Sequence, residues 1–401
     1  MEKKGWKIVA EVDVVALLKE GYKWWKKRKG ESWKVEVKGE ERIIRIKETP
    51  ETFGKRFIIV EDIATGDHTL MDMKDVKPIT KLTKNEAEKM AFKRIDIFKA
   101  IRFIKKLTQE DGGVLSHEGS MALPGPSAQS LLALYELSNI YPEKNILPKD
   151  ELEKRVRWLA NIREWRDWEG HPFNCFAASA SLWALSVTFG LISKKLKSKV
   201  TKTARKLSSR IIDNFNEEEH GWSWTKEVKP TYPFYTFSAL KSLKEAKRFL
   251  PNGTLEMIAT LETEAIKGLR GYLKTNGDYG NTAMALWAIY ETQGEKIEDE
   301  RALAKICNAI EKKKSIALHT RPLEFHIQIM LPEVIIPMVK IAPESIYTVR
   351  AVKKFLEWMK ETQEEGWQWV HVSKDASWAT AKALLAYATV IRTPEVFQKI
   401  I

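Results

Sequence analysis

One pattern recurs along this chain at least five times: a glycine turn, followed by a segment that opens on small residues and runs into Leu, Ala, Tyr or Trp. The turns are Gln109–Gly113, Trp168–Gly170, His220–Trp224, Asn276–Gly280 and Glu365–Trp369. A sixth, degenerate copy fits between 321 and 338. A period of roughly 45 to 57 residues is typical of one helical hairpin per repeat, and such a hairpin cannot bury its apolar face alone. The sequence therefore predicts six hairpins that close into a ring.

The predicted ring occupies residues 81–401, where the apolar period is almost entirely helical. Residues such as Leu131, Leu134 and Tyr135 are expected on inner helices, and segments such as 151–162 on outer ones. Paired inner and outer helices make an (α/α)6 toroid whose turns gather at one rim around a central cavity. A hydrophobic content of 44% in 401 residues is sufficient for this core and a second domain.

Residues 1–80 have a different pattern and predict a small all-β, barrel-like domain. Short β-branched runs at 33–37, 42–47, 57–60 and 68–73 are separated by glycine and proline. An aromatic and basic cluster precedes them: Trp24, Trp25, Lys26, Lys27 and Arg28. This cluster resembles the opening of oligonucleotide-binding small barrels, which implies binding of single-stranded nucleic acid. Alternatively, Trp24, Trp25 and Trp33 pack between the small domain and the ring.

A second basic segment lies between Lys194 and Arg210, where eight Lys or Arg residues occur without an acid. Its apolar residues recur every three or four positions, so it predicts an amphipathic helix with a basic outer face. Lys195, Lys199, Lys202 and Lys206 are candidate nucleic-acid contacts, in keeping with the net charge of +13. The alternative is that this face is simply solvated.

Composition also bears on the source and compartment. Cys175 and Cys307 are too few for a disulfide framework. No apolar run has the roughly 20 residues that cross a bilayer, and no signal peptide is visible, so a cytoplasmic protein is expected. The 30% of charged residues is of a kind seen in hyperthermophiles.

The repeated turn resembles that of terpenoid cyclases and protein prenyltransferases. Gln109–Gly113 is similar to their Gln-x-x-Asp-Gly-Gly turn, and Gln363–Trp367 is a looser copy. The resemblance covers roughly 85 to 395 and implies the toroid fold. The segment from Asp278 also resembles the Asp-x-Asp-Asp-Thr-Ala motif that protonates the substrate in the cyclases. Gly280 and Asn281 stand where that motif has its second and third acids, so loss of this chemistry is expected.

Metal and cofactor sites are not predicted. The Asp-x-Cys element implied by the prenyltransferase resemblance is missing, because Asp278 is followed two residues later by Gly280. One local alternative joins His171 and Cys175 to His117, His220 or His371 across the rim. These histidines are equally suited to cap inner helices or bind loop carbonyls.

Aromatic side chains at the rim suggest another enzyme class, because they form stacking surfaces for sugars. The predicted rim residues, besides the histidines above, are Trp165, Trp168, Trp222, Trp224, Tyr279, Trp367, Trp369 and Trp378. Glycoside chemistry also needs two carboxylates roughly 5 to 9.5 Å apart. The candidate acids are Glu118, Asp278, Glu324 and Asp375, and no motif pairs them. Alternatively, the aromatic residues lock one hairpin to the next.

The main prediction is a non-catalytic binding or scaffold protein whose favoured partner is nucleic acid. The alternative is an enzyme that uses the toroid cavity on an isoprenoid or a polysaccharide. A small hydrophobic or sugar ligand in that cavity belongs to this alternative.

Overall fold

The computed structural model places the chain in two compact units, Met1–Ile95 and Asp96–Ile401. It describes residues 30–37, 40–48, 57–62, 68–72, 76–82, 95–162, 173–226, 228–229, 231–274, 279–294, 299–312, 327–369 and 374–400. Within these residues, no helix has the length and apolar content that crossing a bilayer requires.

The first unit contains a five-stranded antiparallel sheet in the order β4-β3-β2-β1-β5. Its strands are β1 (Ser32–Val37), β2 (Glu40–Glu48), β3 (Phe57–Asp62), β4 (His68–Asp72) and β5 (Val76–Leu82). Alternate residues point to one face, where Trp33, Val35, Ile44 and Ile46 are buried with their neighbours. Trp33 therefore lies in the core of this sheet. Trp24, Trp25, Lys26, Lys27 and Arg28 lie outside the described residues, and nothing in the structure supports an oligonucleotide-binding barrel.

The second unit is built from helices in two layers. The inner helices are α4 (Pro124–Ile140), α6 (Cys175–Thr188), α8 (Pro233–Ala246), α10 (Tyr279–Gln293), α12 (Ile327–Ile341) and α14 (Ser377–Ile391). The outer helices are α3 (Ile97–Lys106), α5 (Lys149–Asn161), α7 (Lys194–Asp213), α9 (Asn252–Lys274), α11 (Glu300–Glu311) and α13 (Ile346–Thr362). A last helix, α15 (Pro394–Ile400), packs on α13 and α14. The short 3-10 turns η2 (Pro142–Lys144), η3 (Phe189–Leu191) and η4 (Lys247–Phe249) follow α4, α6 and α8.

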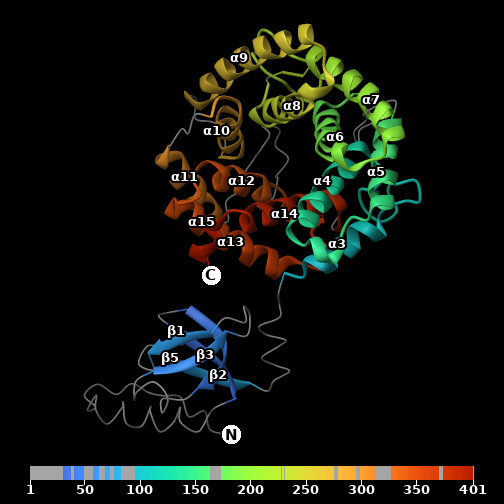
Figure 1. Cartoon of the computed structure of the whole chain (residues 1–401). Coiled ribbons are helices and arrows are strands. Elements are labelled where there is room, and N and C mark those ends of the chain that lie inside the picture. The colour runs from blue at the N-terminus through green and yellow to red at the C-terminus, as the bar shows by residue number, and fades with distance from the viewer. Residues whose placement is uncertain are drawn as a thin grey trace, which may run out of the picture. The chain divides into compact units, whose positions relative to one another are not determined.

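The inner helices form a closed ring (Figure 1). Each contacts the next inner helix along the chain, and α14 contacts α4 to complete the circle. Each outer helix from α5 to α13 packs against the two inner helices that flank it in sequence, and α3 packs on α14. The structure thus confirms the mainly α fold and the ring of helical hairpins. Of the degenerate sixth copy between 321 and 338, the part from 327 lies in α12, and its turn lies outside the described residues.

The two layers differ in composition, as the repeats predict. Every inner helix is more hydrophobic on average than every outer helix, because an inner helix is contacted on all sides. Outer helices such as α5 and α7 are amphipathic and bury one apolar stripe. Several helices start at a side-chain cap, in which the oxygen of Asp96, Asn174, Asp299 or Ser345 accepts a hydrogen bond from a first-turn N–H.

The recurring glycine turns lead from an outer helix into the next inner helix. In three of them, the residue after the glycine donates its backbone N–H to a hydroxyl in the first turn of that inner helix. The pairs are Val114 to Ser127 at 2.8 Å, Trp222 to Thr236 at 3.1 Å and Trp367 to Thr380 at 2.9 Å. The small residues that open each inner helix are therefore part of the turn.

Close approach explains why glycine recurs in these turns. A Cβ atom on Gly366 would lie 2.3 Å from the hydroxyl of Thr380, and one on Gly221 would lie 2.8 Å from that of Thr236. Gly112 has a φ of +100° and packs against the backbone of α5. The repeat spacing seen in the sequence thus reflects one steric requirement met several times.

The turns also bind each hairpin to the preceding one in the ring. The carbonyl of Trp224, before α8, accepts a hydrogen bond from the N–H of Cys175 at the start of α6. The carbonyl of Ser116, before α4, does the same for Ser377 at the start of α14, at 2.9 Å. This last bond joins the first hairpin to the last and helps to close the ring.

Candidate active site

A lysine and a glutamate are paired inside the ring, where the surrounding helices are otherwise apolar. Lys382 lies on α14 and its ammonium forms an ion pair with Oε1 of Glu333 on the neighbouring helix α12. Their side chains are only 8% and 7% exposed. Removing both groups from water is unfavourable, so a buried pair of this kind is weak evidence for stability. A role in function is therefore the more informative hypothesis for it.

Aromatic rings from three helices surround the lysine. Its Nζ lies 4.6 Å from the ring centroid of Trp378 and 5.5 Å from those of Phe176 and Phe234. Phe176 and Phe234 are stacked on each other, with centroids 5.0 Å apart. Each of these aromatic residues is the second residue of its inner helix, on α6, α8 and α14 respectively. Together with Glu333, they bring four inner helices to one point.

The three aromatic residues of the cluster differ in exposure. Phe234 is buried, at 7% exposed. Phe176 and Trp378 are only partly buried, although they also lie in the first turn of an inner helix. The more exposed part of the cluster thus lies at the N-terminal ends of the inner helices, where the glycine turns also lie.

Burial shifts both titratable groups of the pair toward their neutral forms. Desolvation raises the pKa of the Glu333 carboxyl above its ordinary value, although the charge of Lys382 and its hydrogen bond oppose this. Desolvation likewise lowers the pKa of Lys382, against the opposing effect of Glu333. Cation–π contacts contribute about 0.5 to 2 kcal/mol to holding a charged lysine. Because the effective penalty for burying an ion is several kcal/mol, desolvation outweighs them.

Two buried acceptor oxygens near this point have no donor among the described residues. One is Oε2 of Glu333, and the other is Oε1 of Gln129 on α4. Gln129 is 7% exposed, and α4 adjoins both α6 and α14. Gln129 lies two residues after Ser127, and Lys382 lies two residues after Thr380. The hydroxyls of Ser127 and Thr380 are equivalent, because each accepts a hydrogen bond from a backbone N–H of a glycine turn. The shared register puts Gln129 on the same face of its helix, and at the same height, as Lys382.

These features define what the site would bind. Unsatisfied buried acceptors are costly, and they are satisfied by a ligand that donates hydrogen bonds. The partly exposed faces of Phe176 and Trp378 offer flat apolar contact. A carboxyl with a raised pKa is suited to act as a general acid near neutral pH. The arrangement therefore fits a neutral, hydroxyl-rich molecule more closely than an anion.

Several residues predicted for the rim have structural contacts instead of free faces. Trp222 and Trp367 are 0% and 1% exposed. Their indole N–H groups donate to Ile211 and Met359 in the preceding outer helices, at 2.7 and 3.3 Å. Both rings thus fill the space between hairpins and leave no surface for a sugar. Trp224 is partly exposed and lies near Tyr235, with centroids 6.4 Å apart.

The described candidate acids and histidines at the rim have local structural contacts. One oxygen of Asp375 accepts from the N–H groups of Glu365 and Gly366, at 2.9 and 2.6 Å, which holds the last glycine turn. Glu118 is exposed and lies 3.7 Å from Lys106. His220 has its Nδ1 3.0 Å from a carboxylate oxygen of Glu264 on α9.

Only some of the remaining rim candidates lie in the part of the chain that the structure describes. His117 pairs with Ala376 in an isolated bridge between hairpins, and Tyr279 begins α10. Trp369 lies in the short strand β6 (Gln368–Trp369), which pairs with β7 (Lys374–Asp375). The others lie outside the described residues: Trp165, Trp168, His171, Asp278, Glu324 and His371. The described residues contain no group of three or more His, Cys, Asp or Glu side chains placed to hold a metal ion.

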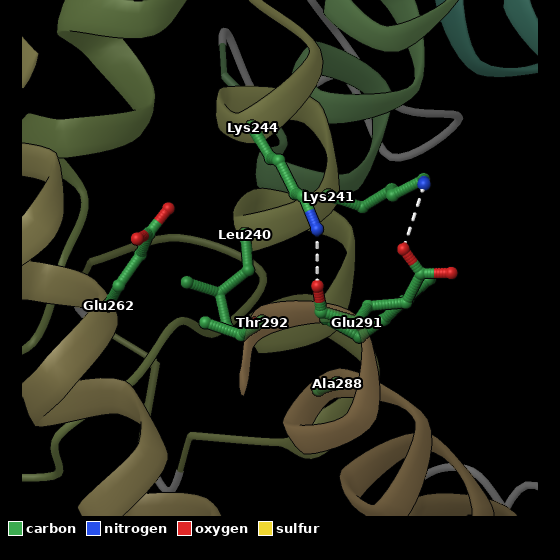
Figure 2. A pocket seen from close by; sticks show the side chains of 8 residues that line it. Leu240, Lys241, Lys244, Glu262, Ala288, Glu291 and Thr292 are labelled. Atoms are coloured by element: carbon green, nitrogen blue, oxygen red, sulfur yellow. Dashed lines mark hydrogen bonds and ion pairs between the residues drawn. The ribbon is translucent and has the colours of Figure 1, made fainter. Parts of the chain in front are cut away.

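The opposite end of the ring holds a small pocket between α8, α9 and α10 (Figure 2). The space within it that the centre of a water molecule can occupy is about 10 Å³. Typical ligand pockets measure about 300 to 1,000 Å³. Lys241 and Glu291 project toward each other across it, with their charged atoms 3.0 Å apart. This pocket is too small and too well satisfied to be the main ligand site.

The basic segment forms the amphipathic helix α7, as predicted. Leu196, Val200 and Ala204 are buried against the rest of the ring. Lys195, Lys199, Lys202 and Lys206 are exposed on its outer face. They belong to the solvent side of the outer layer, which gives a physical reason for a run of lysines without any ligand.

Sequence reasoning missed Glu333, Lys382 and Gln129, although a signal was present. The first halves of α4, α6, α8 and α10 contain no charged residue. Lys382 interrupts a run of alanines in α14, and Glu333 follows Pro332 in the otherwise apolar α12. A charge in the first half of an inner helix is therefore the anomaly that points to the site.

Comparison with known proteins gives structural matches only. No family model matches the chain, and no match was found among curated proteins. The structure of cellobiose 2-epimerase from Bacillus thermoamylovorans B4167 is similar, with a TM-score of 0.52 and 14% identity over 73% of this chain and 98% of that one. Two inactive variants of the GH76A α-1,6-mannanase of Salegentibacter sp. HEL1_6 are also similar. One is in complex with α-1,6-mannotetrose (TM-score 0.50, 9% identity) and the other with α-1,6-mannotriose (TM-score 0.50, 10% identity), each over 75% of this chain and 98% of that one.

These matches show an α/α toroid and correct the main functional prediction. A non-catalytic scaffold that favours nucleic acid is the wrong reading, because the solved proteins that share this ring are enzymes with carbohydrate ligands or substrates in their names. The matches do not support membership of the terpenoid cyclases, an oligonucleotide-binding domain or a hyperthermophilic source.

Proposed function

We propose that this chain is an enzyme that acts on a neutral carbohydrate at the N-terminal end of its inner helix ring. The observation that carries the proposal is the buried cluster of Glu333, Lys382 and three aromatic rings, with two acceptor oxygens left unsatisfied nearby. Sugar hydroxyls donate to such acceptors, and the apolar face of a pyranose packs on an aromatic ring. The carbohydrate-active proteins with the same ring support this choice of substrate class.

In this proposal, Glu333 is the proton donor and acceptor. Its Oε1 is held by Lys382, which leaves Oε2 as the oxygen that faces the substrate. The raised pKa of the carboxyl keeps a protonated fraction available for transfer to a leaving or ring oxygen. If the reaction is glycoside hydrolysis, a second carboxylate is needed. The sequence candidates for it are Glu118, Asp278, Glu324 and Asp375, of which Asp278 and Glu324 lie outside the described residues.

The test is a product assay of the full chain with α-1,6-mannooligosaccharides and with cellobiose, using chromatography that separates both hydrolysis products and epimers. We expect turnover of at least one of these sugars. Glu333→Gln should reduce kcat by about 10² to 10⁴, the usual contribution of a general acid or base. Lys241→Met, at the other end of the ring, is the matched control and should retain activity. Absence of turnover on every sugar, or full activity of the Glu333 variant, would overturn the proposal.

A further inference from the structure

The setting of Lys382 is unusual for a charged lysine. An ammonium group has three N–H donors. Among the described residues, the polar partner of Lys382 is one oxygen of Glu333, and its other neighbours are the rings of Phe176, Phe234 and Trp378. The cation–π contacts with these rings only partly replace the water that the ammonium loses on burial. A neutral amine, with a lone pair and fewer donors to satisfy, fits this surrounding better than an ammonium.

A carboxyl lies where a proton relay is needed. Glu333 contacts Nζ directly through Oε1, so a proton can pass between the two groups without water. Its second oxygen has no donor among the described residues and is free to receive or deliver a proton elsewhere. A desolvated lysine beside such a group is the usual setting of a lysine that attacks carbonyl carbon.

We infer that Lys382 is a nucleophile that condenses with the aldehyde of an open-chain sugar to form an imine, with Glu333 relaying the protons. This inference rests on the proposed function, because it concerns the same cluster, and it narrows the substrate class to sugars with a reducing end. Gln129 then binds a hydroxyl of the open chain through its unsatisfied Oε1. Phe176 and Trp378 cover the entry from the rim.

The step balances without any oxidant or reductant. Glu333 accepts a proton from the Lys382 ammonium, and the Nζ lone pair then forms a bond to the carbonyl carbon. The carbonyl oxygen takes up the proton from Glu333 and becomes the hydroxyl of a carbinolamine. Nitrogen next returns a proton to Glu333, which passes it to that hydroxyl. Water leaves and the C=N bond forms, so that one aldehyde and one lysine ammonium give one protonated imine and one water.

The experiment is reductive trapping of the full natural chain with glycolaldehyde, the smallest hydroxyaldehyde, and sodium cyanoborohydride at pH 7. Peptide mapping by mass spectrometry then locates the adduct. We expect labelling of Lys382 to be several-fold faster than of the exposed Lys195 on α7, because burial lowers the pKa of Lys382 and so raises its neutral fraction. The natural chain carries its own comparison, so the result does not depend on a variant that folds.

Two further measurements test the role of Glu333 as a proton relay and the binding of a sugar at Lys382. Glu333→Gln should slow labelling of Lys382 and leave that of Lys195 unchanged, since only the relay is lost. A reducing mannobiose should protect Lys382 from glycolaldehyde. Labelling of Lys382 no faster than of Lys195, or none at all, would overturn the imine.

The failure of this inference is distinguishable from failure of the proposed function. Mannotriitol, a mannotriose reduced to the alditol, has no aldehyde and tests the sugar site alone. If it binds or is turned over while Lys382 stays unlabelled, the carbohydrate enzyme stands and the imine is wrong. If Lys382 is labelled selectively but no oligosaccharide is bound or converted, the imine stands and the proposed oligosaccharide reaction is wrong.

Discussion

The two ends of the inner ring each hold a lysine and a glutamate on separate helices, but the pairs differ in how well their polar atoms are satisfied. Near the N-terminal end, Glu333 has one oxygen on Lys382 and one with no donor among the described residues. At the C-terminal end, Lys241 donates to one oxygen of Glu291 at 3.0 Å (Figure 2). The indole N–H of Trp287 donates to the other oxygen at 3.2 Å. Among the described residues, both carboxylate oxygens of Glu291 therefore have a donor, whereas only one oxygen of Glu333 has one.

The titration of the two carboxyls follows from this difference. Burial raises the pKa of Glu333, and its single partner does not compensate. Burial also acts to raise the pKa of Glu291, but the charge of Lys241 and the bonds from Lys241 and Trp287 outweigh it and lower the pKa. The contacts alone thus distinguish Glu291, a carboxyl that is fully paired within the fold, from Glu333, a carboxyl with an oxygen left for a ligand.

The largest effect is expected from breaking the buried pair. Lys382→Met leaves the Glu333 carboxyl buried without its cation, which should lower the free energy of unfolding by about 3 to 5 kcal/mol. Lys241→Met, in the pair with 15% and 21% exposed side chains, should cost about 1 kcal/mol or less. Urea denaturation followed by circular dichroism measures both.

A double variant sharpens this result. Glu333→Leu combined with Lys382→Met removes both charges and should regain most or all of the lost stability, since apolar replacement of a buried pair is often neutral or stabilising. It should still have no activity on sugars. A double variant as unstable as the single one would show that the pair holds the ring together, and would contradict the contrast drawn between the two ends.

The next effect concerns the glycine turns, which occur at the N-terminal end of the ring. Gly366→Ala places a Cβ atom 2.3 Å from the Thr380 hydroxyl and 2.7 Å from the Phe103 ring. Overpacking of this kind should cost about 1 to 3 kcal/mol. Gly271→Ala on α9 meets nothing within 4 Å and should instead stabilise the helix by about 0.5 to 1 kcal/mol. Equal effects at the two positions would mean that the turn glycines are not sterically required.

The ring could be predicted from sequence because its determinants are local and repeated. In each hairpin, the turn must pack closely against the start of the following inner helix. Glycine in the turn and a small residue in the helix make this possible, as Gly366 and Thr380 show. The repetition of that requirement makes the period visible. The site could not be predicted in the same way, because Glu333 and Lys382 are paired only through the packing of α12 on α14.

Some aromatic residues at the rim are conspicuous in the sequence but have a structural role. Trp222 and Trp367 stand out in sequence beside the glycines, yet they are buried wedges that donate to the preceding outer helices. Phe176, Phe234 and Trp378 each lie in the first turn of an inner helix, and their rings surround Lys382. It is the buried charges, Glu333 and Lys382, that depart from the apolar repeat and mark the candidate site.

A smaller effect is expected from the hydroxyl that joins turn and inner helix. Thr380→Val removes the acceptor of the buried Trp367 N–H, which should cost about 1 to 2 kcal/mol, the usual penalty for one unsatisfied donor. Thr389→Val on the same helix removes only a local bond to the carbonyl of Leu385, and should change stability by less than about 0.5 kcal/mol. Thermal unfolding of both variants measures these effects. Comparable losses of stability in the two variants would argue against a special role of the turn hydroxyl.

The smallest effect is the pH dependence that Glu291 adds at the C-terminal end. Its folded pKa lies below the ordinary value of 4.5, so its contribution to stability is present above that pH and is lost as the pH falls through the folded pKa. Glu291→Gln should therefore be less stable than the natural chain at pH 7, by about 1 kcal/mol or less, and the difference should shrink below pH 4.5. Because the pKa of Glu333 is shifted in the opposite direction, a difference that grew on acidification would mean that Glu291 behaves like the buried carboxyl, and the two ends of the ring would no longer be distinct.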